Sequence, residues 1–168
     1  MGLFKDFLEG FANGVITTAA NGVQSPRAHG SGNKRIEACC TQLGWGIDER
    51  VGKDGIILYF KDPLVNIRKL MIATGDSGQL AVLTVFSAAE MEPRNIPAEI
   101  MGHLLLRNKE ALFPAWQVMD NGNGNATFAV TYCALVQGLD AGVFKVICET
   151  MCKEVHEFDA KLRQAGML

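Results

Sequence analysis

The sequence lacks a long hydrophobic run and an excess of charge of either sign. No apolar stretch approaches the roughly 20 residues that cross a bilayer as a helix. Lysine and arginine number 16 and aspartate and glutamate 18, which gives a formal net charge of -2. Nucleic-acid-binding proteins usually carry a concentrated basic excess, so this near-neutral charge argues against that class. With 48% hydrophobic and 20% charged residues, the composition is that of a globular domain.

Signals for export or lipid attachment are also lacking at the N-terminus. The chain starts Met1-Gly2-Leu3-Phe4-Lys5-Asp6, and the charged and polar residues interrupt the apolar core that a signal peptide needs. Gly2 satisfies the first requirement of a myristoylation motif, but Asp6 stands where that motif has serine or threonine. We therefore expect a cytoplasmic protein without a membrane span.

The cysteines do not form a disulfide pattern. Their number is odd and their spacing is not that of a disulfide framework. They are Cys39, Cys40, Cys133, Cys148 and Cys152. Free thiols in a reducing compartment are expected, most of them packed as small apolar residues.

Residues 1–20 are predicted to form an amphipathic helix. Its apolar side has a strongly aromatic character, and its polar side carries both charge signs. The residues expected to contact a partner are Phe4, Phe7, Leu8 and Phe11. Residues 21–33 are rich in glycine, serine, asparagine and proline and are predicted to be a flexible linker. The sequence leaves open whether this helix docks on its own domain, on a second subunit or on another protein.

Residues 34–168 are predicted to form one α+β domain. A short helix ends at Gly44 and an extended segment starts at Trp45. Strands are expected at residues 56–60, 66–73, 79–88, 115–119 and 126–135, a helix starting at Pro97, and a long helix capped by Asp140. The order is helix, four strands, helix, two strands, helix. This predicts an antiparallel sheet of about six strands with helices packed on it.

The tetrapeptide Gly75-Asp76-Ser77-Gly78 is similar to the nucleophile segment of chymotrypsin-like proteases. A triad needs a histidine base, and the three histidines are predicted to lie in the linker and on two helices. Strands are predicted on both sides of the tetrapeptide, so a hairpin turn explains it. The segment from Asp120 to Asn125 is likewise predicted to be a hairpin turn rather than a calcium loop, because it lacks the ligands and the closing glutamate.

Cys148, Cys152 and His156 are spaced by four on the last predicted helix and are candidate zinc ligands. One helix seldom supplies three tetrahedral ligands, and the sequence offers no second cluster for a fourth. Cys39 and Cys40 are adjacent and could form only a strained disulfide. We therefore predict no metal, no cofactor and no catalytic residue.

From Pro97 onward the sequence resembles the YbjN family, which has the type III secretion chaperone-like fold. The segments that carry the resemblance are Leu104–Asn108, Thr127–Tyr132, Gly138–Asp140 and a last helix with Met151, Glu154, Phe158 and Asp159. The resemblance implies a compact sheet with packed helices, often dimeric, which binds protein segments and has no established catalytic residues. It also implies a structural role for Asn108 at the end of its helix.

These observations favour a non-enzymatic protein-binding or chaperone-like module that forms a homodimer. On the helix predicted to start at Pro97, one side carries Ile100, Met101, Leu104, Leu105, Asn108 and Leu112. Leu106 lies off that side and is a candidate contact residue. The alternative is a small-ligand-binding or regulatory protein with a pocket at the sheet, which could use Cys133, His103 or Tyr132. No spacing in the sequence assembles these three residues into a site.

Overall fold

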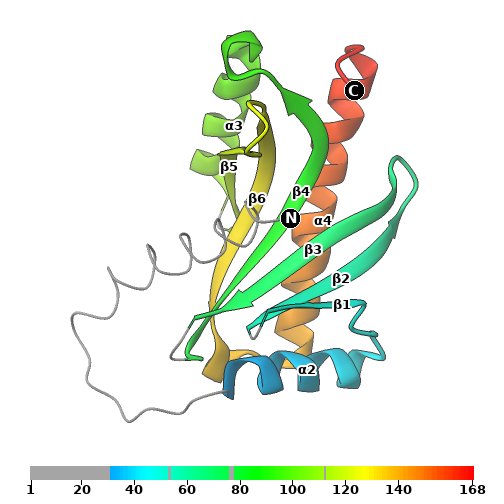
Figure 1. Cartoon of the computed structure of the whole chain (residues 1–168), viewed down its shortest axis with the longest axis vertical. Helices are drawn as coiled ribbons and strands as arrows, with labels where there is room; N and C mark the ends of the chain where they lie inside the picture. The colour runs from blue at the N-terminus through cyan, green and yellow to red at the C-terminus, as the bar shows by residue number, and fades with distance from the viewer. Residues whose placement is uncertain (1–30, 53, 76–77, 112) are drawn as a thin grey trace, which may run out of the picture. The chain divides into compact units, whose positions relative to one another are not determined.

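The computed structural model describes residues 31–52, 54–75, 78–111 and 113–168 of the chain. Its elements are α2 (Ser31–Leu43), β1 (Glu49–Val51), β2 (Gly55–Asp62), β3 (Asn66–Thr74), β4 (Leu80–Met91), η2 (Pro93–Asn95), α3 (Ala98–Glu110), β5 (Ala115–Asp120), β6 (Ala126–Leu135), η3 (Val136–Gly138) and α4 (Ala141–Gln164) (Figure 1). The predicted helix at residues 1–20 lies outside the described residues, as does the predicted linker up to residue 30.

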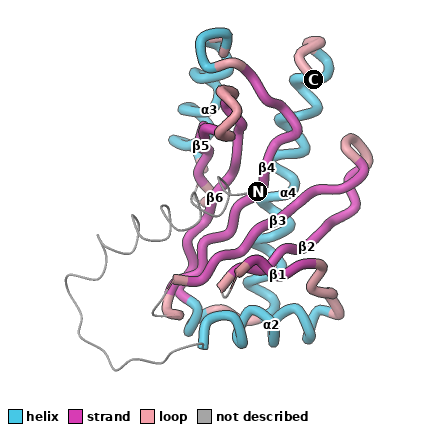
Figure 2. Tube along the Cα trace, viewed as in Figure 1, coloured by secondary structure: helices cyan, strands magenta, loops and turns pink. Residues whose placement is uncertain are grey.

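The strands form one six-stranded sheet in the order β1-β2-β3-β4-β6-β5 (Figure 2). The two edge pairings, β1 with β2 and β5 with β6, are antiparallel, and Trp116 lies opposite Val130 in the second. The α+β class and the element order predicted from the sequence are confirmed. Among the described residues, no helix combines the length and the hydrophobicity that crossing a membrane requires.

The domain divides into two compact units. The first contains the described residues up to Leu58 together with Met71–Leu83 and Cys133–Val146. The second contains Tyr59–Leu70, Thr84–Tyr132 and Ile147–Leu168. The candidate surface and the buried polar cluster described below both belong to the second unit.

Helix α2 belongs to the first unit and starts at Ser31. Ile36, Cys39 and Cys40 form its buried side, as the helical spacing predicts. Arg35 Nε donates a hydrogen bond of 2.8 Å to the Leu139 carbonyl. A Cβ atom on Gly32 would lie 2.9 Å from the Gly78 carbonyl oxygen, so a larger residue would displace this end of the helix. The helix thus begins three residues before the predicted start of the domain, so residues 31–33, which were predicted to be linker, are helical.

Helix α4 is the long helix predicted from the sequence. Val143 N donates to Asp140 Oδ1 at 2.8 Å, which confirms Asp140 as the N-terminal cap. Every residue of its predicted apolar side is buried, namely Phe144, Ile147, Cys148, Met151, Val155, Phe158 and Leu162. In the second unit, the Phe158 ring lies 4.7 Å from the Trp116 ring and 5.4 Å from the Phe128 ring, centroid to centroid. These tilted aromatic contacts join α4 to β5 and β6.

Both predicted hairpin turns are present. Gly78 N donates to the Gly75 carbonyl at 2.7 Å, between β3 and β4. In the β5–β6 turn, Asn121 N donates to the Asn125 carbonyl, and Gly122 and Gly124 have φ angles of 76° and 84°. Glycine adopts these positive φ values without the steric penalty that other residues meet. Local turn geometry therefore accounts for the motif from Asp120 to Asn125. In the other motif, Asp76 and Ser77 lie outside the described residues.

Candidate functional site

A small set of buried and hydrogen-bonded residues attaches helix α3 to the second unit. Ile100 and Leu104 are its buried side chains. At its end, Asn108 Nδ2 donates to the Trp116 carbonyl at 3.0 Å, and Trp116 N donates to Asn108 Oδ1 at 2.6 Å. The amide therefore supplies both hydrogen bonds that an adjacent strand would supply to β5. This confirms the structural role expected for Asn108 from the sequence resemblance.

The outer side of α3 carries large apolar residues that no described part of the chain covers. Leu105 is 66% exposed, Leu106 59% and Met101 37%. The predicted apolar side of this helix included Met101 and Leu105 with Ile100 and Leu104, and the structure buries only the last two. Leu106 is exposed, as its position off that side suggested. We define Met101, Leu105 and Leu106 as the α3 surface.

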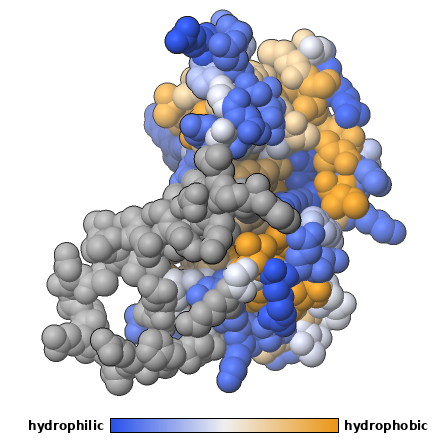
Figure 3. Space-filling model, viewed as in Figure 1, coloured by the Kyte–Doolittle hydropathy of each residue, from blue (hydrophilic) through white to orange (hydrophobic). Residues whose placement is uncertain are grey.

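The neighbouring edge strand adds to the apolar exposure of the second unit. Val118 of β5 is 39% exposed, although the adjacent Trp116 and Met119 are buried. β5 is the last strand in the sheet order, so one side of its backbone has no described strand partner. Hydrophobic residues also reach the surface among hydrophilic ones on the face of the molecule drawn in Figure 3.

The other predicted contact residues, Phe4, Phe7, Leu8 and Phe11, lie outside the described residues. Their role stays a prediction. The structure therefore places one of the sequence-derived contact positions, Leu106, and adds Leu105 and Met101 beside it in the same helix.

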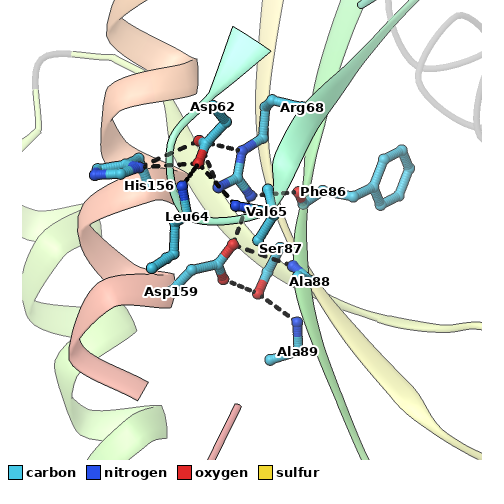
Figure 4. A network of polar contacts seen from close by, with 10 residues as sticks. All are labelled: Asp62, Leu64, Val65, Arg68, Phe86, Ser87, Ala88, Ala89, His156 and Asp159. Carbon is cyan, nitrogen blue, oxygen red and sulfur yellow. Dashed lines mark hydrogen bonds and ion pairs between the residues drawn. The ribbon is translucent and has the colours of Figure 1, made fainter. Parts of the chain in front are cut away.

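A buried ionic cluster in the second unit was missed by the sequence analysis (Figure 4). Arg68 is 2% exposed and bridges two carboxylates. Its Nη2 donates to Asp62 Oδ2 at 2.8 Å, and its Nη1 donates to Asp159 Oδ2 at 2.5 Å. The three residues come from β2, β3 and α4, so only the fold brings them together. A lone arginine in a predicted strand carries no sequence signal for such a contact.

The remaining oxygen atoms of the cluster are also used. Asp62 Oδ1 accepts hydrogen bonds from Leu64 N and Val65 N, at 2.8 and 3.2 Å. Asp159 accepts the Ser87 hydroxyl and, at 3.2 Å, Ala88 N. No buried side-chain nitrogen or oxygen in the described part of the chain lacks a hydrogen-bond partner. The cluster is thus a saturated structural network that ties the β2–β3 turn to β4 and α4.

The pKa of Asp62 is shifted by its surroundings in the cluster. Burial alone would raise its pKa, but the hydrogen bonds from Arg68 and Leu64 and the guanidinium charge lower the pKa to about 2. His156 Nδ1 lies 3.2 Å from both Asp62 oxygens at the partly exposed edge of the cluster. Asp62 therefore stays ionised near neutral pH and offers no proton for acid catalysis.

The cysteine environments do not favour nucleophilic chemistry. Burial raises the pKa of Cys40 to about 11 and that of Cys152 to about 12, and burial also raises the pKa of Cys39. Partial desolvation by neighbouring atoms raises the pKa of Cys133, although this residue is exposed. A thiol with a raised pKa has little of the thiolate form that attacks an electrophile or binds a metal. Cys148 is fully buried in the apolar side of α4. In residues 31–168, apart from the undescribed positions, no three metal-binding side chains group together.

The residues proposed for the alternative ligand site, Cys133, His103 and Tyr132, have different surroundings in the structure. Cys133 is exposed on β6 in the first unit. Tyr132 and His103 belong to the second unit, where the Tyr132 ring packs on Phe113 at 5.2 Å and the His103 ring on Phe158 at 6.5 Å. Each ring therefore has a separate aromatic neighbour.

The fold is similar to that of solved proteins of the kind that the sequence resemblance implies. YbjN from E. coli has a TM-score of 0.60 with 14% sequence identity, over 82% of this chain and 95% of that chain. A chain of the HopA1–SchA chaperone–effector complex has a TM-score of 0.57 with 8% identity, over 76% of this chain and 92% of that one. These identities are so low that the likeness is one of fold.

A third similar chain comes from the complex of the Yersinia pestis type III secretion chaperone SycH with a stable fragment of YscM2. It has a TM-score of 0.52 with 9% identity, over 73% of this chain and 94% of that chain. No protein-family model and no curated protein matches the sequence. The structural similarity to YbjN and to type III secretion chaperones is confirmed.

Proposed function

We propose that this protein is a non-enzymatic, chaperone-like protein-binding module that works as a homodimer in the cytoplasm. The observation that carries the proposal is the α3 surface. Leu105 and Leu106 project from a helix whose neighbours Ile100 and Leu104 are buried, so both sides of the helix have apolar character. Exposed apolar groups beside an edge strand are a common feature of protein-binding surfaces.

The fold similarity supports the same proposal. Two of the similar chains come from complexes of a chaperone with another protein, an effector in one and a fragment of YscM2 in the other. A shared fold hosts several functions, so it supports protein binding only together with a surface suited to it. The exposed leucines of α3 provide such a surface in this chain.

The polar groups of the domain support a non-enzymatic role. The Asp62–Arg68–Asp159 network is buried and uses its hydrogen-bonding capacity within the protein. Burial keeps Cys40 and Cys152 in their thiol forms at neutral pH, because their pKa values are raised to about 11 and about 12. Catalytic groups usually combine access to substrate with a pKa near the working pH, which these groups do not.

We propose a second contact segment at the N-terminus, where Phe4, Phe7, Leu8 and Phe11 share one side of the predicted helix. Such a helix fits the groove of a partner through side chains one turn apart. Its two polar-side acids, Asp6 and Glu9, outnumber Lys5 and make an anionic membrane surface a poor match.

The decisive experiment is a mass measurement by light scattering on the full chain and on Leu106→Glu. We expect a dimer for the parent chain and a monomer for the variant, because a buried carboxylate without a partner opposes association. Val146→Glu is the matched control. Val146 of α4 is also an exposed apolar residue, with 55% exposure, but it belongs to the first unit, whereas α3 belongs to the second. It should leave the mass unchanged.

The outcomes separate the parts of the proposal. A Leu106→Glu chain that remains a dimer would show that the α3 surface is not the interface. A monomeric parent chain would reject the homodimer and leave α3 as a surface for another protein. The same measurement on a chain starting at Ser31 tests the N-terminal segment. If that chain alone is monomeric, residues 1–30 join the subunits and the partner must bind elsewhere.

A further inference from the structure

His103 of α3 packs against the aromatic cluster of the second unit. Its ring is nearly parallel to that of Phe158, with 8° between the planes and 6.5 Å between the centroids. Phe158 in turn packs on Trp116 and Phe128. His103 is half-buried in this position. The imidazole is therefore part of the apolar contact that holds α3 in place, beside Ile100 and Leu104.

Charged groups of both signs surround His103. Arg107 and Glu110 lie further along α3, and Glu154 and Lys161 come from α4. Arg107 pairs with Glu154 and lies 3.9 Å from Glu110, so both acids are engaged by Arg107. Burial is the largest cause that lowers the pKa of His103 below 6.5, and the charges of Lys161 and Arg107 lower it further. The two glutamates act in the opposite direction and do not outweigh these causes.

We propose that His103 is an acid-sensitive contact: protonation of its imidazole displaces it from Phe158 and loosens α3, the helix that carries Leu105 and Leu106. The neutral ring fits the apolar stack, whereas an imidazolium there must give up hydration next to Lys161 and Arg107. The consequence for partner binding rests on the proposed function of the α3 surface, but the loosening itself does not.

The direction of the effect follows from the lowered pKa. A histidine that is harder to protonate in the folded state favours folding while it is neutral. The contribution is complete above pH 6.5 and decreases as the pH falls below 6.5, because the unfolded chain then binds more protons than the folded one. A histidine paired with a carboxylate would have the opposite dependence. Acid below pH 6.5 is therefore the range in which α3 should loosen.

Two measurements on the full chain test whether α3 loosens in acid, and neither needs a binding partner. The first is an NMR titration of the histidine ring protons. The chain has three histidines, His29, His103 and His156, so the variants His29→Gln and His156→Gln assign the signals. We expect His103 to titrate below 6.5. A midpoint at or above 6.5 would overturn the proposal and would mean that attraction between the imidazolium and the Phe158 ring or the glutamates prevails.

The second measurement is the fluorescence of Trp116 against pH. Trp116 is buried against Phe158, and replacement of the other tryptophan, Trp45→Phe, leaves it as the single probe. We expect its emission to shift to longer wavelength as the pH falls below 6.5 and the contact opens. His103→Phe keeps an aromatic ring without a titrating group and should abolish that shift. His156→Gln is the matched histidine control and should retain it.

The results distinguish this inference from the proposed function. An unchanged acid shift in His103→Phe would overturn the role of His103, whatever the oligomeric state. If the shift depends on His103 and the dimer dissociates over the same pH range, the acid-sensitive contact and the α3 interface are both supported. If the shift depends on His103 and the mass does not change with pH, the contact is supported and the α3 interface is rejected. His103→Gln, a neutral polar variant, provides a second test if the phenylalanine variant does not fold.

Discussion

Helices α3 and α4 use their apolar residues differently. The apolar side of α4 is buried along its whole length, from Phe144 to Leu162. Helix α3 buries Ile100 and Leu104 but exposes Met101, Leu105 and Leu106. Burial of an apolar side chain contributes about 1.5–3 kcal/mol to stability, which α4 gains along this side and α3 lacks at Leu105 and Leu106. Helix α4 also exposes Val143 and Val146, which lie outside its buried side. A helix that leaves large apolar side chains exposed is a better candidate for partner binding than a helix whose apolar side is buried within the chain.

The ionic contacts of the two helices show the same difference. Asp159 of α4 is fully buried on Arg68, which is itself almost inaccessible to solvent. Arg107 of α3 pairs with Glu154 of α4, and these two side chains remain 35% and 23% exposed. Solvent weakens the second pair, whereas the first is held in a low-dielectric interior. The cluster around Arg68 therefore fixes α4, and α3 is attached by a more accessible contact.

The largest effect is expected from removing one member of the buried cluster. Asp159→Ala leaves Arg68 as a buried charge with only Asp62 to pair it, and should lower the free energy of unfolding by about 3–5 kcal/mol. Glu154→Ala removes the exposed pair and should cost only about 0–1 kcal/mol. Urea unfolding of both variants measures the comparison. Equal losses would show that the two helices are attached by contacts of similar strength.

A smaller and sharper contrast is available within α3 itself. Leu104→Ala should lower the free energy of unfolding by about 2–5 kcal/mol, because Leu104 is buried. Leu105→Ala makes the same chemical change at the next residue and should alter stability by no more than about 0.5 kcal/mol, because Leu105 is exposed.

Thermal and urea unfolding should be measured at a concentration at which the chain is monomeric, since association would add stability through Leu105. A large loss in Leu105→Ala under those conditions would mean that Leu105 is covered within the monomer. That result would remove the main distinction between α3 and α4.

The sequence predicted the parts of this architecture that depend on local pattern. Period and capping located α4, because its apolar residues recur at helical spacing behind Asp140. The same period grouped Leu105 with Leu104 on α3, although only Leu104 is buried. Periodicity shows which residues share a side of a helix. It does not show how much of that side the rest of the fold buries. The exposure of Leu105 could therefore come only from the structure.

The Arg68 cluster lay beyond sequence reasoning for a different reason. Asp159 lies 91 positions after Arg68, although Asp62 lies only six positions before it. Arginine and aspartate are mostly surface residues, so a sequence pattern gives no reason to pair them in a core. The spacing of Cys148, Cys152 and His156 suggested candidate zinc ligands, whereas the structure shows His156 in contact with Asp62. An alignment of related chains, with paired changes at the two positions, is the signal that could have found it.

The response to strong acid provides the last test of the difference between the two helices. The pKa of Asp62 is lowered from 3.8 to about 2 in the folded state. A carboxylate with a lowered pKa favours folding above pH 4, and its contribution is lost as the pH falls from about 4 to 2. The gap corresponds to about 2 kcal/mol of unfolding free energy, since each pH unit is worth about 1.36 kcal/mol. The urea midpoint should therefore fall steeply below pH 4.

Asp62→Asn removes the titrating group and should flatten that part of the profile, at the cost of lower stability at neutral pH. His103→Phe should leave it unchanged, because that variant keeps Asp62 and loses only the imidazole that packs on Phe158. If the two variants flattened the same pH range, the α3 contact and the buried cluster would open together. Separate pH ranges would show that α3 can loosen while the Arg68 cluster still holds α4. A helix that binds a partner reversibly requires such independence.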